Sequence, residues 1–427
     1  MARTRAVRME DKRHQLVQLL MQRIARSTAR RHEGKVTYLI GNNGTGKSRL
    51  LAELAERLSI TKPTRIVACI ASSIHDRFTF GDHGRNGQVR YLGARNAPNA
   101  VFQAAVDRQL SRFILQAMSK DPRRFKHLSD AASIDLSFLL SRKSIESLDQ
   151  LPPKETKANT RLRKRAQSRN LLAPGALAML RRIAEGSGRF ERLTKAQIPT
   201  LLAYLDLGVD IELAVALPEG RSIRFTDLST GEQNRILLFA KVLGAMDEGT
   251  VFLIDEPEIS LHLHWQMELH ERLMGLLAKL SRVHVVIATH APVIISEAAR
   301  YDKENLHNVV AVLDRVSEKK HTLAKDNSAS GKFTFKLHSF AEVSSHEQLV
   351  LRQFHTAPYQ AREVAVEIAE AVLRVAEGDE RGDKAIEILH LLRGAKGLSA
   401  EAEQQIDAAI LLIERDLVTS IKQATSA

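Results

Sequence analysis

A mostly apolar run, a glycine-rich loop and a helical pattern follow one another near the beginning of the chain. Residues 36–40 (V-T-Y-L-I) predict a buried strand, residues 41–48 (G-N-N-G-T-G-K-S) match G-x-x-x-x-G-K-S, and residues 49–58 predict a helix. The glycines let the backbone curl so that successive N–H groups point at one spot, where the helix N-terminus adds a favourable dipole. Lys47 and Ser48 add an ammonium group and a hydroxyl there. This order predicts an α/β fold with a phosphate-binding loop.

The loop also predicts which residues bind the phosphates and their metal ion. Lys47 is expected to reach the β- and γ-phosphates, and Ser48 is expected to ligate Mg²⁺. We therefore expect ATP and Mg²⁺ as cofactors. The predicted nucleotide-binding residues of this stretch are Asn42, Asn43, Gly44, Thr45, Gly46, Lys47, Ser48 and Arg49.

Two carboxylates follow a second apolar run. Residues 251–254 (V-F-L-I) predict a buried parallel strand, and Asp255 and Glu256 come at its C-terminal end, where α/β sheets place their ligands. Asp255 can hold Mg²⁺, directly or through water, and Glu256 can orient an attacking water or accept its proton. Asp255 and Ser48 are thus the predicted metal ligands.

A second anion-binding helix end is predicted between these two motifs. Residues 227–233 (D-L-S-T-G-E-Q) lead into a helix predicted over residues 232–246. The Ser229 hydroxyl and glycine N–H groups then lie at a helix N-terminus and face outward. Such a helix end can bind the γ-phosphate of a nucleotide that another subunit presents.

A third predicted strand, residues 284–288, ends in Thr289 and His290. A single histidine after a strand is usually a loop residue with local hydrogen bonds, but this one lies 35 residues after Asp255. The order and spacing of Gly41–Ser48, Ser229–Gln233, Ile254–Glu256 and His290 resemble the ABC-type ATPases within the P-loop NTPases. The resemblance covers residues 36–300, with a helical insert at 100–206.

The resemblance implies roles that the residues alone do not. Ser229, Gly231 and Glu232 would complete the nucleotide site of a second subunit, so that two copies form a head-to-tail homodimer or a higher oligomer. His290 corresponds to the switch histidine, whose position suits a hydrogen bond to the γ-phosphate. The catalytic residues implied for a slow or regulated ATP hydrolase are Lys47, Glu256 and His290. The family's Mg²⁺-binding glutamine corresponds to either Gln88 or Gln103.

Three stretches narrow the resemblance. Residues 255–262 (D-E-P-E-I-S-L-H), Trp265-Gln266 and residues 289–292 (T-H-A-P) look like the AAA_21/OLD-like ATPases of prokaryotic defence systems; His264 departs from the subgroup's usual proline. The Asp-x-Asp pair of the nuclease domain that OLD nucleases carry is not found after His290. The chain therefore resembles the ATPase subunit of Septu-type anti-phage systems, stand-alone or retron-associated. That resemblance implies a separate HNH nuclease as partner and, in the retron form, a reverse transcriptase with its RNA–DNA product.

Charge is distributed unevenly along the chain. The net charge is +13, and residues 108–200 alone hold 20 Lys/Arg against 8 Asp/Glu. This excess favours nucleic acid or another acidic partner at the insert, although a solvated connector is the alternative. We expect residues 152–170 to be a flexible basic segment. Residues 342–427, with 9 Lys/Arg against 15 Asp/Glu, are expected to form an acidic helical cap or a docking platform for a partner protein.

The sequence predicts a domain order and a compartment. We expect the ATPase domain at 1–100 and 209–341, the basic helical insert at 101–208 and the helical C-terminal domain at 342–427. The single cysteine, Cys69, excludes a disulfide framework, and the apolar run around 283–295 is too short and too polar to cross a bilayer. A cytoplasmic protein without membrane contact is therefore expected. The alternative function is a DNA-repair or chromosome-maintenance ATPase resembling SMC or RecF heads, which the basic insert favours.

Overall fold

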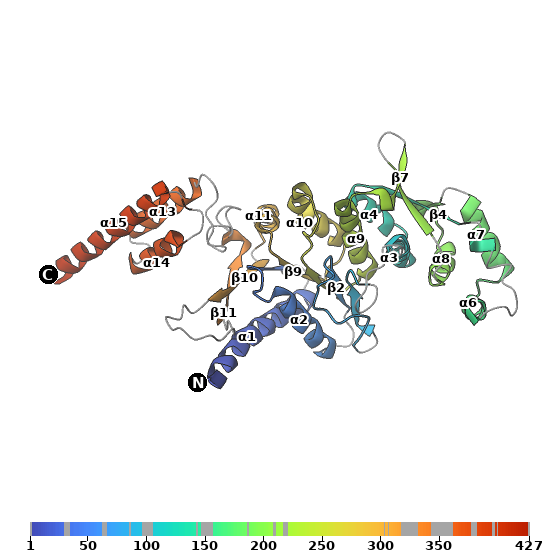
Figure 1. Ribbon diagram of the computed structural model, residues 1–427, viewed down its shortest axis with the longest axis horizontal. Helices are drawn as coiled ribbons and strands as arrows, with labels where there is room; N and C mark the ends of the chain where they lie inside the picture. Colours follow the sequence, from blue (N-terminus) through green and yellow to red (C-terminus); the bar gives the residue numbers. More distant parts are fainter. Residues whose placement is uncertain are drawn as a thin grey trace. The chain divides into compact units, whose positions relative to one another are not determined.

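The computed structural model describes residues 2–29, 35–61, 66–84, 87–95, 106–141, 144–146, 157–185, 188–207, 211–216, 221–302, 304–305, 307–316, 332–342, 362–376, 382–394, 398 and 400–425 (Figure 1). The chain divides into two compact units. The first unit comprises residues 1–38 and 46–289, and the second comprises residues 39–45 and 290–427. In the described part of the chain, no helix has the length and apolar character needed to cross a membrane.

The main sheet has seven strands in the order β11-β10-β1-β9-β8-β2-β3. Neighbours β9, β8, β2 and β3 are parallel, and every residue of β1, β2, β8 and β9 is buried. Such uniformly buried strands are typical of a parallel sheet with helices on both faces. The strands are β1 (Val36–Ile40), β2 (Val67–Ala71), β3 (Val89–Leu92), β8 (Val251–Asp255), β9 (His284–Thr289), β10 (Val309–Val316) and β11 (Lys332–Ser339).

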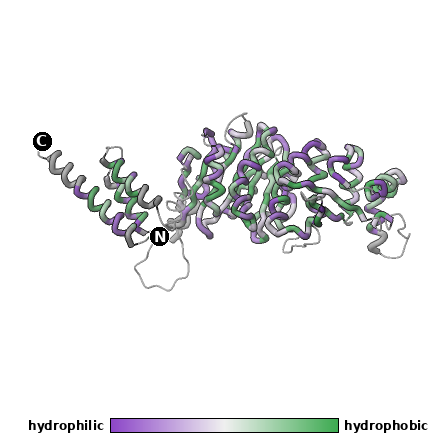
Figure 2. Tube along the Cα trace, turned by 90° about the horizontal axis from the view of Figure 1, so that it is seen from above, coloured by the Kyte–Doolittle hydropathy of each residue, from purple (hydrophilic) through white to green (hydrophobic). Residues whose placement is uncertain are grey.

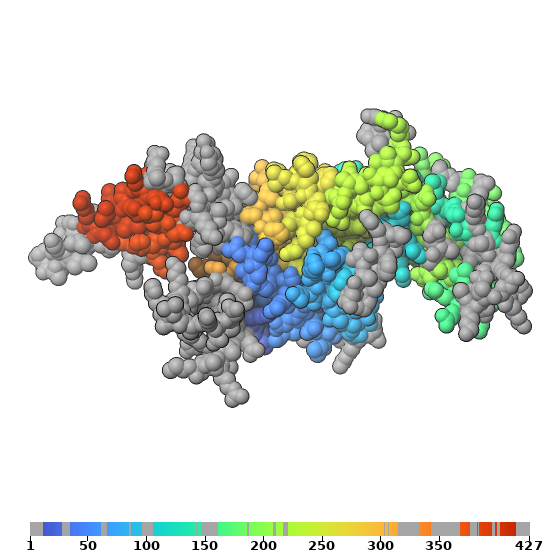
Figure 3. Space-filling model, viewed as in Figure 1, coloured from blue at the N-terminus to red at the C-terminus, as the bar shows by residue number. Residues whose placement is uncertain are grey.

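Two helices from the N-terminal part of the chain pack on this sheet. The N-terminal helix α1 (Ala2–Ala29) contacts α2 (Lys47–Thr61) and β9, and α2 also contacts β2 and β8. The sequence places Leu16, Leu19, Leu20 and Ile24 of α1 at helical spacing, and all of them except Leu19 are buried. The strand predicted at 36–40 is found at those residues. Figure 3 shows α2 (blue) and α10 (Leu263–Leu277, yellow) exposed on one surface of this unit.

The insert is mostly helical, as the sequence predicts, but two strands of a second sheet also lie within it. The four antiparallel strands of this sheet run in the order β5-β4-β6-β7. They are β4 (Asp135–Leu140), β5 (Gly188–Arg189), β6 (Ile211–Ala216) and β7 (Ser222–Arg224). The helices around it are α3 (Val106–Lys120), α4 (Arg124–Ala132), α7 (Pro174–Glu185) and α8 (Gln197–Leu205). Leu136, Phe138 and Leu140 of β4 are buried, and their alternation is the signal of a half-buried strand.

The basic segment predicted to be flexible contains a helix, α6 (Lys157–Ser168). Arg, Lys, Ala, Leu and Gln, which favour helices, supply most of its residues. Tertiary contacts hold its end, because Ala166 and Leu171 are buried and Arg165 Nη2 donates to the Asp206 carbonyl over 2.6 Å. The prediction failed because it weighed only the scarcity of apolar residues in this segment.

The second unit contains the β10–β11 pair and a helical bundle. β10 and β11 are antiparallel, with Val309 opposite Ser339. α11 (Pro292–Tyr301) begins with a proline at its first turn. The bundle consists of α13 (Arg362–Ala376), α14 (Gly382–Arg393) and α15 (Ala400–Thr425), whose core includes Leu389, Ile406 and Ile413. Figure 2 shows apolar residues (green) recurring among hydrophilic ones (purple) along these helices. The sequence also favours a hairpin at 327–331 and a helix at 347–354, and both lie outside the described residues.

Candidate nucleotide-binding site

The glycine-rich loop has the backbone geometry of an anion-binding nest. Gly44 and Gly46 have φ of +83° and +95°, values that an L side chain rarely adopts. Thr45 closes the turn, because its N–H and Oγ1 donate to the Asn42 carbonyl over 3.2 and 2.9 Å. A Cβ on Gly41 would lie 2.4 Å from the Leu313 carbonyl oxygen, so only glycine fits there. Backbone N–H groups in such a curl, at the start of α2, form a binding site for phosphate oxygens.

Lys47 is nearly buried at the start of α2, although it is a lysine. Only 5% of the residue is exposed. Burial lowers the pKa of its ammonium group, while the carboxylates of Glu256, Glu258 and Asp255 act in the opposite direction. Lys47 therefore supplies a positive charge directly after the N–H groups of the loop, where a phosphate group would accept a charge-assisted hydrogen bond.

Ser48 and Asp255 meet at the end of β8. Ser48 Oγ donates to Asp255 Oδ1 over 3.1 Å, and 3% of Asp255 is exposed. The pKa of Asp255 is raised to about 7, mainly by burial and also by the carboxylates of Glu256, Asp76 and Glu258, while the Ser48 hydrogen bond acts in the opposite direction. A hydroxyl and a carboxylate oxygen held together are hard ligands of the kind Mg²⁺ prefers when phosphates supply the others. The residues therefore fit a bound Mg²⁺.

Glu256 has an unusual backbone conformation. Its φ is +48°, in the left-handed region that costs a non-glycine residue about 1–3 kcal/mol. The Glu256 N–H donates to the Ala288 carbonyl of β9 over 2.8 Å, and the chain then turns through Ile259, whose N–H donates back to the Glu256 carbonyl. Strained residues of this kind concentrate at functional sites. The turn leaves the Glu256 side chain only partly buried beside Asp255.

The helix that follows residues 227–229, α9 (Thr230–Ala245), begins with a complete capping box. The Glu232 N–H donates to Ser229 Oγ over 3.3 Å, and the Ser229 N–H donates to Glu232 Oε2 over 2.9 Å. Ser229 and Thr230 are exposed. Gln233 Nε2 donates to the Thr226 and Leu228 carbonyls, which fixes the preceding loop. The helix N-terminus is therefore rigid and open to solvent, as an anion-binding end requires.

Gly231 joins this helix end to the turn after Glu256. A Cβ on Gly231 would lie 2.4 Å from the Ser260 carbonyl oxygen and 3.3 Å from Trp265. Trp265 in turn lies under the guanidinium of Arg235, whose Cζ is 4.3 Å from the ring centroid. The first turn of α9 is thus packed against the segment that follows the two carboxylates.

The other residues that the sequence proposes for the nucleotide site are mostly exposed. Asn42, Asn43 and Arg49 are exposed, and so is His290, directly after β9. Gln88 Nε2 donates to the Leu58 carbonyl over 3.0 Å, and Gln88 precedes β3 at the edge opposite Asp255. The structure therefore excludes Gln88 as a Mg²⁺ ligand beside Asp255. Gln103 lies outside the described residues.

A buried group of charged side chains, which the sequence did not predict, lies near Asp255. Asp76, in the loop after β2, pairs with Arg95 Nη2 over 2.7 Å and accepts from Tyr91 Oη over 2.8 Å. Lys241 of α9 is buried and donates to the carbonyls of Ala71 and Gly93, at the ends of β2 and β3, over 3.2 and 3.3 Å. This group ties the helix that begins at Ser229 to the strand ends beside Asp255. The one sequence signal was a lone lysine within the apolar run of residues 236–246.

Lys241→Met is expected to change how stability depends on pH. Burial lowers the pKa of Lys241 to about 8 from 10.5, so between these pH values the unfolded chain binds more protons and the stability of the native chain rises with pH. The free energy of unfolding of the native chain, relative to the variant, should increase by about 2 kcal/mol between about pH 7.5 and 9.5. Urea titrations at the two pH values measure this. The exposed Lys279→Met serves as control, and an equal pH response of all three proteins would contradict the account.

The nest, the buried lysine, the Ser48–Asp255 pair and the strained glutamate at a parallel sheet define a P-loop ATPase. Residues 36–296, more than half of the chain, match the family AAA_21, described as "AAA domain, putative AbiEii toxin, Type IV TA system". The chain belongs to this family. A comparison with curated proteins finds no match.

Solved structures were also compared. One is an ABC transporter assigned to the metal-chelate type, in an inward-facing conformation, at 14% identity and a TM-score of 0.28, covering 77% of this chain and 84% of that one. Another is the Smc head domain from Pyrococcus furiosus with an extended coiled coil, bound to the C-terminal domain of ScpA. It is 12% identical, with a TM-score of 0.29, and covers 72% of this chain and 91% of that one. Both similarities are too low to support an argument about function.

Proposed function

We propose that this chain is an ATPase subunit whose two copies enclose ATP head-to-tail, and that it regulates a separate HNH nuclease in anti-phage defence. The observation that supports the ATPase part most directly is the meeting of Lys47, Ser48, Asp255 and Glu256 at the end of the parallel strands. The nuclease partner and the defence role rest on the resemblance of residues 255–262 and 289–292 to defence ATPases.

Each residue has a distinct task in this proposal. Lys47 and the loop N–H groups hold the phosphates, while Ser48 and Asp255 hold Mg²⁺, which when bound neutralises the charge that develops on the transferred phosphoryl group. Glu256, which belongs to an acidic and partly desolvated site, orients the attacking water and takes up its proton. His290 donates a hydrogen bond to the γ-phosphate.

The second copy completes the site. The capped N-terminus of α9 carries exposed Ser229 and Thr230, so it is open to a phosphate from outside the subunit. The Ser229 hydroxyl donates to Glu232 Oε2 over 2.7 Å, and a bound phosphate would replace this acceptor. Gly231 packs on Ser260. Binding of the other copy's phosphate at the start of α9 can therefore shift the turn that follows Glu256. ATP stabilises the closed pair, and hydrolysis changes how the partner nuclease is held.

The defence part is tested in cells that carry the gene with its neighbouring genes. We expect a phage panel to plate less efficiently on these cells than on cells with an empty vector, and we expect Lys47→Ala or deletion of an adjacent HNH nuclease gene to remove the protection. Protection that persists without the nuclease gene would contradict the proposal.

A DNA-repair or chromosome-maintenance ATPase is the second candidate, because the insert is strongly basic. The two functions differ in what stimulates the purified chain. A repair ATPase should hydrolyse ATP faster with duplex DNA alone, whereas the proposed regulator should change its rate mainly when the nuclease is present.

A further inference from the structure

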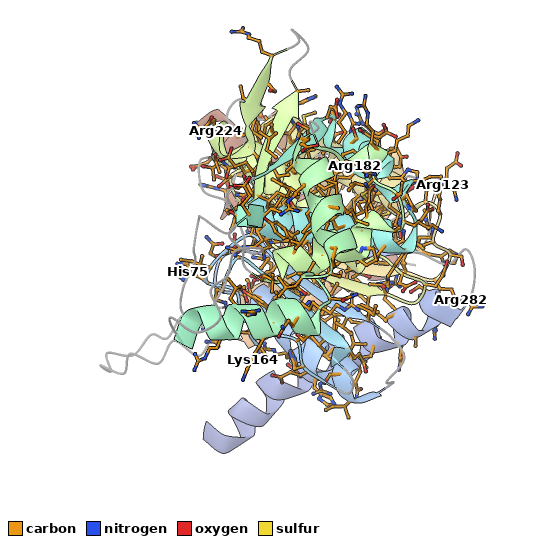
Figure 4. All side chains as sticks on the ribbon, turned by 90° about the vertical axis from the view of Figure 1, so that its right-hand side faces the viewer. His75, Arg123, Lys164, Arg182, Arg224 and Arg282 are labelled. Atoms are coloured by element: carbon orange, nitrogen blue, oxygen red, sulfur yellow. The ribbon has the colours of Figure 1, made fainter. Side chains whose placement is uncertain are left out.

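The end of the first unit that contains α6 and α7 carries a large excess of basic side chains. Between residues 161 and 207 the described side chains include ten Lys or Arg and three Asp or Glu. Nine of the ten basic side chains are exposed: Arg161, Lys164, Arg165, Arg169, Arg181, Arg182, Arg189, Arg192 and Lys195. Figure 4 views this end directly and shows Lys164 on α6 and Arg182 on α7.

Asp206, one of the three acidic residues described in this stretch, forms ion pairs within the insert. Asp206 pairs with Arg169, and Arg112 Nη2 of α3 lies 3.4 Å from its second oxygen. Arg165 donates to the Asp206 carbonyl. These contacts attach the C-terminal end of α6 to the rest of the insert. Glu185 and Glu191 remain as exposed carboxylates, fewer than the basic groups around them.

Among the described residues, no ion-pair or hydrogen-bond partner is found for six of these basic side chains. Three of the six, Arg161, Lys164 and Arg182, lie on α6 and α7, and the others are Arg189, Arg192 and Lys195. Arg161, Lys164 and Arg165 share one face of α6 because they are three and four residues apart, and Ala166 on the opposite side is buried. Figure 1 also places α6 and α7 together at this end of the unit, so both helices contribute to the same basic end. Gathered like-charged groups without partners favour a polyanion.

The burial of the aromatic residues favours a nucleic-acid duplex over a single strand. The aromatic side chains described between 106 and 216 are Phe113, Phe125, Phe138, Phe190 and Tyr204, and all five are buried. Unpaired bases bind proteins largely by stacking on exposed aromatic rings, and this surface offers none. Duplex phosphates require only positive charge at the surface.

We propose that the end of the insert formed by α6 and α7 binds the phosphate backbone of a nucleic-acid duplex without reading its sequence. Arg161, Lys164 and Arg182 contact the phosphates, and the Asp206 contacts hold α6 in place. This inference does not depend on the identity of the nuclease partner or on head-to-tail dimerisation.

The test compares the full chain with the triple variant Arg161→Gln, Lys164→Gln, Arg182→Gln. Fluorescence anisotropy with a 30-base-pair duplex of random sequence, at several salt concentrations, gives Kd and its salt dependence. Loss of about three phosphate contacts should reduce the magnitude of the slope of log Kd against log salt by about 2 to 3 and weaken binding about tenfold or more. A second duplex of different sequence should bind equally.

The matched control is Lys12→Gln, Lys279→Gln, Arg282→Gln, which removes the same charge from exposed positions on α1 and after α10. It should bind the duplex like the native chain. Both variants should retain the native rate of ATP hydrolysis without DNA, because none of these residues belongs to the nucleotide site. Equal loss in both variants would overturn the proposal by showing an effect of net charge alone.

Two further outcomes would also overturn it. One is tighter binding of a single strand of the same length than of the duplex. The other is binding of an acidic polypeptide, tested as poly-glutamate, without binding of duplex at low salt, which would assign the surface to an acidic protein partner.

Discussion

Replacing Lys47 with alanine is expected to weaken ATP binding about 100-fold or more, because each charge-assisted hydrogen bond to phosphate contributes about 1.5–3 kcal/mol. Lys47 is buried among three carboxylates, so its removal leaves their negative charge uncompensated where the phosphates bind. Isothermal titration calorimetry with ATP and Mg²⁺ measures the loss.

The same variant should remain folded. Burial lowers the pKa of Lys47 in spite of the three carboxylates, so the desolvation cost that alanine removes outweighs the attraction that is lost. Thermal unfolding of the variant without nucleotide should therefore occur at or near the native midpoint. The account is contradicted if ATP binds a well-folded Lys47→Ala within threefold of the native affinity.

Glu256→Gln is expected to separate binding from hydrolysis. The amide keeps the shape of the side chain but cannot take up a proton, and loss of a general base lowers rates about 100- to 10,000-fold. ATP affinity should stay within a few-fold of the native value, and light scattering should show dimers or higher assemblies accumulating with ATP.

Glu258→Gln is the matched control, two residues further along the same turn. Glu258 is buried, with 5% exposed, and its carboxylate acts on both Lys47 and Asp255. We expect a smaller loss of hydrolysis and no accumulation of the ATP-bound assembly. Equal losses in the two variants, or no gain in assembly for Glu256→Gln, would exclude Glu256 as the base.

The sequence predicted the elements whose signals are local. The run at 36–40, the loop at 41–48 and the carboxylates after 251–254 each combine a periodicity with a motif, and the structure places strands and helices there. The capped start of α9 was predictable for the same reason, since Ser229 and Glu232 satisfy each other within one turn.

Features that depend on distant residues were not predictable. α6 is held through Asp206, about 40 residues away, and the pairing of β4 with β6 joins segments that are more than 70 residues apart in the chain. The carbonyls that Lys241 contacts lie 170 and 148 residues away, so its role required coordinates. Sequence alone also left Gln88 open, although its hydrogen bond to Leu58 places it away from Asp255.

The central claim is that the helix end at Ser229 acts on the nucleotide of another copy, and mixing two inactive variants tests it most directly. Lys47→Ala disables the loop, whereas Ser229→Asp keeps a good N-cap but places a carboxylate against the phosphate. Each variant alone should hydrolyse almost no ATP. Co-expressed in equal amounts, the two should recover about a quarter of the native rate, because half of the dimers would carry one intact site. No recovery, with mixed dimers demonstrated by two affinity tags, would contradict a site shared between subunits.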